Sequence, residues 1–145
     1  MQKPIRDELK LENQLCFPLY ACSREVIKRY RPFLDELGLT YTQYVAMMVF
    51  WEQGAISVKE LGQKLYLDSG TLTPVLKSLE QKGYITRRRS ETDERVLIAA
   101  LTDAGAALRE NAAEIPGRIC ACIQLEPEEA MQLHQLLYKL LDVMK

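Results

Sequence analysis

The most reactive side chains in this sequence belong to four cysteines: Cys16, Cys22, Cys120 and Cys122. Only a thiolate attacks a peroxide, and the positive end of a helix dipole lowers the pKa of a thiol placed there. Pro18 is typical of a first helical turn, so Cys16 is expected at the start of a helix. Cys16 is therefore a candidate redox thiol, although a cysteine on an apolar helix face more often belongs to a core.

Other thiol chemistry fits the spacing poorly. One residue separates Cys120 from Cys122, which is not the usual spacing of zinc ligands, and beyond His134 no fourth ligand is evident. A thiol peroxidase built on Cys16 needs a redox fold, but the chain has no Cys-x-x-Cys motif and no alternation of strands and helices. With a single histidine and no glycine-rich phosphate loop, the sequence predicts neither an enzyme nor a bound metal or cofactor.

A second chemical feature is an excess of basic side chains in the middle of the chain. The net charge is −1, but residues 77–95 hold six basic and four acidic groups, whereas residues 102–145 hold four basic and seven acidic groups. We therefore expect a polyanion to be met by the middle of the chain alone. The basic residues there are Lys77, Lys82, Arg87, Arg88, Arg89 and Arg95.

The composition is that of one soluble globular domain of 145 residues, 48% apolar and 27% charged. A domain of this length buries roughly 70% of its unfolded surface, so it does not need disulfides to fold. No apolar run approaches the roughly 18 residues of a membrane span, and the N-terminal segment lacks the order of a signal peptide. We expect a cytoplasmic protein that does not bind a membrane.

The elements that position the reactive residues are mostly helices. Apolar residues from Leu15 to Leu37 recur at three- and four-residue steps, which predicts a helix that ends at Gly38. A second helix is expected over residues 42–52, with Thr42 as its N-cap.

Two shorter helices are expected next in the chain. Ser57 and Glu60 have the spacing of a capping box and predict a helix over residues 58–65. Another helix begins within residues 68–71, with an N-cap as late as Thr71, and runs to Lys82.

A hairpin and a helical C-terminal region complete the pattern. Residues 84–89 and 95–101 read as strands joined by the turn-forming and charged residues 90–94. Thr102 caps a further helix, which Pro116 and Gly117 interrupt, and the last helix opens at residues 126–129 and continues through a leucine-rich stretch to Leu141.

Two short helices joined by a tight turn and followed by a hairpin with a basic root predict a winged helix-turn-helix in a mainly helical fold. A helix fits the major groove of DNA, and a thin hairpin reaches the adjacent minor groove or backbone. The same pattern also fits a solvated face on an ordinary helix. The residues expected to contact DNA are Ser69, Thr71, Thr73, Lys77 and Ser78 on the second helix, and Arg87, Arg88, Arg89, Asp93 and Arg95 on the hairpin.

The long helices at both ends predict a homodimer. The stretch from Leu133 to Leu141 is too apolar for burial on one side only, although the ends could instead fold back on their own domain. We expect an N-terminal helical region over 1–37, a DNA-binding lobe over 38–101 and C-terminal dimerisation helices over 102–145. Two equivalent reading helices about one DNA turn apart match a pseudo-palindromic site in double-stranded DNA.

Over nearly its whole length the sequence resembles the MarR-type winged-helix transcription regulators. The clearest motif is Asp93-Glu94-Arg95 followed by Leu101-Thr102. The resemblance implies that Arg95 enters the minor groove, with Asp93 beside it.

Two stretches, residues 13–20 and 67–74, are similar to the organic-hydroperoxide-sensing repressors within that family. This resemblance implies that Cys16 is the peroxide sensor and that Tyr30 and Tyr41 contact it across the dimer, with Tyr20 in a supporting position. Phenolic hydroxyls of tyrosines can hydrogen-bond a thiolate and stabilise it.

The resemblance also implies how oxidation ends. Peroxide converts a thiolate to a sulfenic acid, which condenses with a second thiol. That thiol belongs either to a low-molecular-weight compound or to the C-terminal region of the partner subunit, where Cys120 and Cys122 lie; both can equally be apolar fillers of a dimer helix, and Cys22 is expected to be structural. The sequence thus predicts a repressor that leaves its operator when an organic hydroperoxide oxidises Cys16. The alternative is a MarR-type repressor that a small aromatic ligand releases, with Cys16 incidental.

Overall fold

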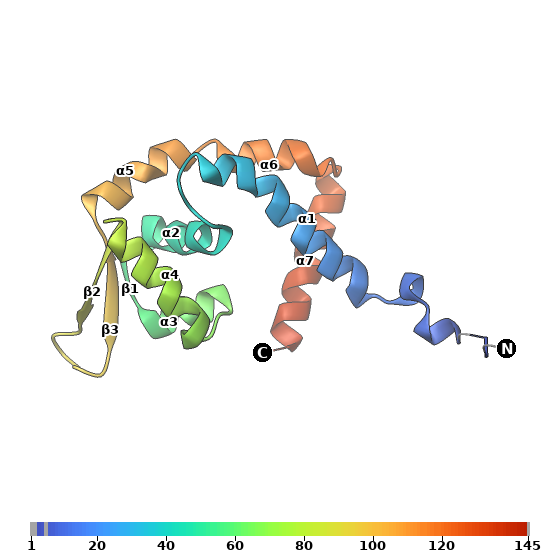
Figure 1. The fold of residues 1–145 in the computed structure, drawn as a ribbon, viewed down its shortest axis with the longest axis horizontal. Coiled ribbons are helices and arrows are strands. Elements are labelled where there is room, and N and C mark those ends of the chain that lie inside the picture. Colours follow the sequence, from blue (N-terminus) through green and yellow to red (C-terminus); the bar gives the residue numbers. More distant parts are fainter. Residues whose placement is uncertain (1–2, 5, 145) are drawn as a thin grey trace. The chain divides into compact units, whose positions relative to one another are not determined.

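The computed structural model describes residues 3, 4 and 6–144 as a succession of helices with one small sheet (Figure 1). The chain divides into two compact units, one reaching to Ile115 and the other starting at Pro116. None of the helices among the described residues combines the length and the apolar character needed to cross a membrane.

The first long helix is confirmed. Two short 3-10 turns, η1 (Asp7–Leu9) and η2 (Leu11–Asn13), precede α1 (Cys16–Asp35), and Gly38 has a positive φ of 67° just beyond it. A left-handed residue at this place is a common way to end a helix.

The next helix, α2 (Tyr41–Gln53), corrects one prediction: its N-cap is Thr40, not Thr42. The Thr40 hydroxyl accepts a hydrogen bond from the Gln43 backbone N–H, and the Gln43 side-chain oxygen accepts one from the Thr40 backbone N–H. This reciprocal pair satisfies two backbone donors at once, which a cap at Thr42 does not offer.

The helix-turn-helix is present. Helix α3 (Val58–Leu65) has the predicted bounds and is capped by Ser57, and Tyr66 turns the chain in the left-handed region with φ 57°. Helix α4 (Ser69–Gln81) starts earlier than Thr71, because the Asp68 carboxylate accepts the Thr71 backbone N–H at 2.7 Å and caps it.

The sheet has three antiparallel strands in the order β1-β3-β2. The predicted hairpin is β2 (Ile85–Arg89) with β3 (Leu97–Leu101), and Arg87 pairs with Ala99 in its register. Strand β1 (Ala55–Ser57) adds to the other edge of β3 and was not predicted, because three residues are too few to show a strand period.

The core lies where α2, α3 and α4 meet the sheet. Its largest fully buried side chains are Phe50, Met47, Leu61, Leu72, Leu76, Leu79 and Ile85. Burying one such side chain contributes about 1.5–3 kcal/mol, so this cluster fixes the angle between the two helices of the helix-turn-helix.

Helix α5 (Asp103–Ala112) packs unusually close to the chain before β2. Thr102 caps it as predicted, and the Trp51 indole N–H donates to the Gly105 carbonyl at 2.8 Å. A Cβ atom at Gly105 would lie 2.2 Å from the Tyr84 carbonyl oxygen, so only glycine fits there.

The second unit contains most of α6 (Ile115–Ile123) and all of α7 (Pro127–Val143). The break before α6 falls at residues 113–114 rather than at Pro116 and Gly117. Pro116 is the second residue of α6, where a helix needs no backbone N–H, so proline is accommodated rather than disruptive. Helix α7 begins as predicted, with Glu126 and Glu129 forming a capping box.

Candidate DNA interface and thiol site

Helix α4 presents a polar face opposite its buried one. Leu72, Leu76 and Leu79 are buried, while four of the five residues predicted to contact DNA on this helix are exposed: Ser69, Thr71, Thr73 and Lys77. Ser78 is an exception to the prediction, because it is half-buried and its hydroxyl accepts the Gln43 side-chain N–H at 2.9 Å.

The N-terminus of α4 is held by hydrogen bonds. The backbone N–H of Thr71 keeps the pKa of Asp68 below its ordinary value, so the cap is a carboxylate at neutral pH. The Thr73 hydroxyl donates to the Ser69 carbonyl at 2.7 Å, which leaves its oxygen lone pairs as the part that can meet a ligand.

The tip of the hairpin is organised by Asp93. Its Oδ1 accepts the Arg95 backbone N–H at 3.0 Å and the Arg95 Nε–H at 3.2 Å, and the backbone bond lowers the pKa of Asp93. The Arg95 side chain is 91% exposed all the same. Asp93 thus aims a solvated guanidinium outward from the tip, which is the arrangement expected for a wing that reaches DNA.

The three arginines of β2 differ in their surroundings. Arg87 donates to Glu80 through its backbone N–H at 3.0 Å and its Nη2 at 3.1 Å, and its side chain is only 22% exposed. Hydrogen bonds from the Arg87 side chain lower the pKa of Glu80. Arg87 therefore joins the hairpin to α4 and is less available than predicted.

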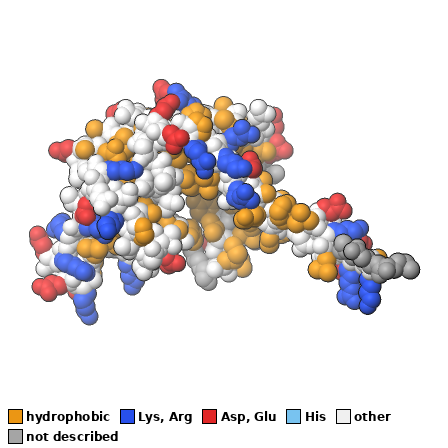
Figure 2. Space-filling model, viewed as in Figure 1, with side chains coloured by type: hydrophobic (Ala, Val, Ile, Leu, Met, Phe, Trp, Pro, Cys, Tyr) orange, Lys and Arg blue, Asp and Glu red, His pale blue; other side chains and the backbone are white. Residues whose placement is uncertain are grey.

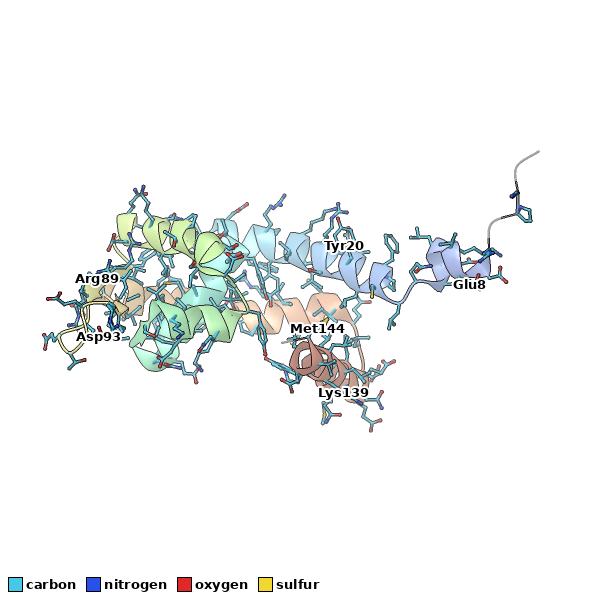
Figure 3. The ribbon with its side chains drawn as sticks, turned by 90° about the horizontal axis from the view of Figure 1, so that it is seen from below. Glu8, Tyr20, Arg89, Asp93, Lys139 and Met144 are labelled. Atoms are coloured by element: carbon cyan, nitrogen blue, oxygen red, sulfur yellow. The ribbon has the colours of Figure 1, made fainter. Side chains whose placement is uncertain are left out.

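Arg88 and Arg89 remain at the surface. Arg88 lies 3.7 Å from the Glu91 carboxylate, and both of these arginines are exposed. Figure 3 shows Arg89 and Asp93 on the same hairpin, whose side chains project outward. Charged side chains of both signs gather on that hairpin in the space-filling view (Figure 2).

All four cysteines are exposed in the structure, so burial in the core of a single chain does not explain them. Cys16 is the first residue of α1, as predicted. Large apolar side chains that are also exposed surround it in sequence, namely Leu15, Phe17, Leu19 and Tyr20. In Figure 2 hydrophobic side chains cover much of the visible surface of α1.

The two tyrosines expected to support Cys16 lie next to each other in the structure. The rings of Tyr30 and Tyr41 are 4.9 Å apart, and that of Tyr44 is 6.3 Å from Tyr41. Burial raises the pKa of Tyr41, so its phenol stays protonated and able to donate at neutral pH. Tyr20 lies one turn after Cys16, with the Arg24 guanidinium 5.5 Å from its ring centroid.

Cys16 cannot reach these two tyrosines within one chain. Cys16 and Tyr30 lie on the same continuous helix, and fourteen residues at about 1.5 Å each place them about 21 Å apart. Tyr41 packs on Tyr30 and is therefore distant as well. A contact between the thiol and the pair requires a second copy of the chain.

Cys120 and Cys122 lie on α6, two residues apart. Residues two apart on a helix point in nearly opposite directions, so at most one of them faces a given partner. His134 contacts the ring of Tyr138 on α7. Among the described residues, no group of three or more His, Cys, Asp or Glu side chains is arranged to hold a metal ion.

Two residues that shape the site were missed in the sequence. Gln43 stands three residues after Thr40, which is the spacing of a capping box, so this signal was readable. No sequence signal pointed to Glu80, because the turn between α4 and β2 is what brings its partner Arg87 next to it.

Together the helix-turn-helix, the wing and the flanking helices define a winged-helix transcriptional regulator of MarR type. Residues 28–111 match the transcriptional regulator family SarA/Rot, and the chain belongs to that family. It is 53% identical over 138 residues to the organic hydroperoxide resistance transcriptional regulator of Bacillus subtilis, covering 95% of this chain and 94% of the relative. It is 43% identical to the regulator SarZ of Staphylococcus saprophyticus, covering 88% and 87% of the two chains.

Solved structures agree with this assignment. Reduced AbfR bound to DNA has a TM-score of 0.79 and 37% identity, with 96% of this chain and 98% of AbfR covered. BpsR of Bordetella bronchiseptica, at 22% identity and a TM-score of 0.83, supports the fold alone. The predicted winged helix and the resemblance to organic-hydroperoxide regulators are confirmed, and the relatives are regulators rather than enzymes, as expected.

Proposed function

We propose that the protein is a homodimeric repressor that releases its operator when an organic hydroperoxide oxidises Cys16. The observation that carries the proposal is the exposed thiol of Cys16 at the first residue of α1, in a chain 53% identical to the Bacillus subtilis organic hydroperoxide resistance regulator. An exposed thiol can meet a peroxide from solution, which a thiol buried in a core cannot.

DNA binding in this proposal uses α4 and the wing. The exposed polar face of α4 enters the major groove, and Arg95 at the tip of the hairpin reaches the minor groove. The relative AbfR, 37% identical, has been solved bound to DNA, which supports double-stranded DNA as the partner. Two copies then read the two halves of a pseudo-palindromic operator.

Dimerisation in this proposal uses the exposed apolar surface of the flanking helices. None of residues 127–143 of α7, all of them described, is buried in the single chain. Its exposed apolar side chains include Met131, Leu133, Leu136, Tyr138, Leu140 and Val143. Surface of this kind marks an interaction site, and a second copy also supplies the tyrosines that Cys16 cannot reach in its own chain.

The chemistry proceeds in two balanced steps. The Cys16 thiolate attacks the terminal, OH-bearing oxygen of the hydroperoxide and the O–O bond breaks. The sulfur becomes a sulfenic acid, and the alkoxide that leaves takes a proton from water to become an alcohol. A second thiol then displaces water and forms a disulfide. This second thiol belongs either to a low-molecular-weight compound or to Cys120 or Cys122 of a second copy of the chain. The relative AbfR is known in reduced, disulfide and overoxidised forms, which supports thiol chemistry of this kind.

Oxidation affects DNA binding through the spacing of the two α4 helices of the dimer. Loss of the hydrogen bonds between Cys16 and the tyrosines of the second copy lets α1 shift. Half-sites lie about 34–36 Å apart, so a shift of a few ångströms removes the simultaneous fit of both helices.

The test is binding of a fluorescent DNA fragment from upstream of the protein's own gene, followed by anisotropy with and without cumene hydroperoxide. Cys22→Ser is a matched control, since Cys22 is also an exposed thiol on α1. The parent and Cys22→Ser are expected to release the DNA, while Cys16→Ser stays bound. If Cys16→Ser releases as the parent does, or if none of the three releases, the redox proposal is wrong and small aromatic ligands become the next effectors to test.

A further inference from the structure

Gln43 is the one buried polar side chain among the described residues, with 6% of its surface exposed. Its Oε1 accepts the Thr40 backbone N–H at 3.0 Å and the Lys82 ammonium at 3.2 Å, and its Nε2 donates to the Ser78 hydroxyl at 2.9 Å. The Gln43 amide thus joins the first turn of α2 to Ser78 and Lys82 at the end of α4. We call these three hydrogen bonds the tie.

The turn before α2 is joined to the same hydrogen bonds. The Lys82 ammonium also donates to the Gly38 carbonyl, so the turn between α1 and α2 is fastened to the same point. A polar group inside a protein is costly to leave without a hydrogen-bond partner, and the Gln43 amide makes three part-buried hydrogen bonds. Helix α4 therefore follows the first turn of α2 rather than sliding over it.

The other end of this tie is the tyrosine cluster. Tyr41 and Tyr44 flank Gln43 on α2, and the ring of Tyr30 packs on that of Tyr41 at 4.9 Å. A displacement of Tyr41 moves the turn that carries Gln43. Through Ser78 and Lys82 the displacement reaches α4, the helix with the polar face.

The wing is fastened to the same helix. Glu80 lies between Ser78 and Lys82 in sequence and accepts two hydrogen bonds from Arg87 on β2. A rotation of α4 about its end therefore carries the hairpin with it. Hydrogen bonds therefore join both elements of the candidate DNA interface, α4 and the hairpin, to Gln43.

We propose that Gln43 is the positioning residue that couples the tyrosine pair to the DNA interface. When oxidation of Cys16 in one copy displaces Tyr30 and Tyr41 of the other, the Gln43 amide transmits the movement to α4. This inference rests on the proposed function and names the path by which the redox signal reaches DNA. A buried polar network that served folding alone would change stability and leave the redox response intact.

The experiment measures two operator dissociation constants for each variant, one fully reduced and one with Cys16 oxidised as verified by mass spectrometry. The ratio of the oxidised to the reduced constant is the coupling. Gln43→Met keeps the volume and removes the side-chain hydrogen bonds of Gln43. Ser78→Ala removes one of the two hydrogen bonds that join Gln43 to the end of α4, and it leaves the α2 cap intact. Trp51→Phe is the control, because it loses a part-buried hydrogen bond to Gly105 and keeps an aromatic ring beside Tyr44.

We expect Gln43→Met to lower the coupling by about tenfold, within the usual range for a coupling free energy, and Ser78→Ala to lower it less. Trp51→Phe should lower the melting temperature and keep the parental coupling. Parental coupling in both tie variants overturns the inference; if Gln43→Met does not fold, Ser78→Ala decides alone. If the parent itself shows no redox coupling, the proposed function fails and this inference falls with it.

Discussion

The different surroundings of Arg95 and Arg87 predict opposite results for two substitutions of the same type. The Arg95 side chain is 91% exposed, and of its terminal nitrogens Nη2 is 3.5 Å from Asp93. Arg87 is 22% exposed and is bonded twice to Glu80. Arg95→Gln should therefore weaken DNA binding in a salt-dependent way, whereas Arg87→Gln should chiefly lower stability.

The magnitude follows from counterion release. Each phosphate neutralised by the protein contributes about −0.9 to the slope of log K against log salt concentration. One phosphate per Arg95, and two copies per operator, give a slope that is shallower by about 1.8 in Arg95→Gln. A threefold rise in salt then changes the ratio of parental to variant affinity by about sevenfold. Arg87→Gln should leave the slope close to that of the parent.

The assay is fluorescence anisotropy of a labelled operator fragment, titrated between about 0.1 and about 0.3 M KCl. Lys28→Gln serves as the control, since Lys28 is an exposed cation on α1, away from the hairpin (Figure 1). Equal slopes for Arg95→Gln and the parent, or a shallower slope for Arg87→Gln than for Arg95→Gln, would refute the assignment of the two arginines.

Three further outcomes are expected. Gly105→Ala should destabilise by about 3 kcal/mol in a urea melt, because its Cβ meets the backbone, whereas Gly117→Ala has open space and should not. Asp68→Asn keeps a cap that does not titrate. The folded-state pKa of Asp68 lies below 3.8, so its contribution to stability is present at neutral pH and is lost in the parent as the pH falls below about 3.8; the melting temperature of the variant should therefore fall less than that of the parent over this range. Because Cys120 and Cys122 point in nearly opposite directions on α6, only one of Cys120→Ser and Cys122→Ser should abolish an intersubunit disulfide in mass spectra of peroxide-treated protein. If the disulfide persists in both variants, these thiols are excluded.

The sequence predicted elements well where the signal was local. Helix α3 has the predicted bounds because Ser57 caps it and no neighbour offers competing chemistry. The cap of α2 was placed two residues too late, since Thr42 has the same chemistry as the true cap, Thr40, whereas the cap of α4, Asp68, lies within the predicted range of residues 68–71. Tertiary packing decides between such neighbours: Tyr41 must lie inside α2 for its ring to meet that of Tyr30.

The candidate site divides along a similar line. Helical periodicity predicted which residues of α4 are exposed, because one face must cover the core. It could not predict that Ser78 turns inward to Gln43 or that Glu80 takes Arg87 away from the surface. The residues of these pairs are brought together only by the packing of α2, α4 and β2, so a single sequence does not predict the pairs.

In the proposed dimer, the exposed groups of one chain complement those of the other. Cys16 lies about 21 Å along α1 from the tyrosines that would stabilise its thiolate. The apolar side chains near Cys16 and along α7 have no core of their own to fill. If a second copy covers these surfaces, the same contact supplies phenols to the thiol and fixes the distance between two copies of α4. Oxidation of the Cys16 sulfur then changes the distance between the two α4 helices, on which binding to both half-sites depends. A separate signalling domain is not needed for this.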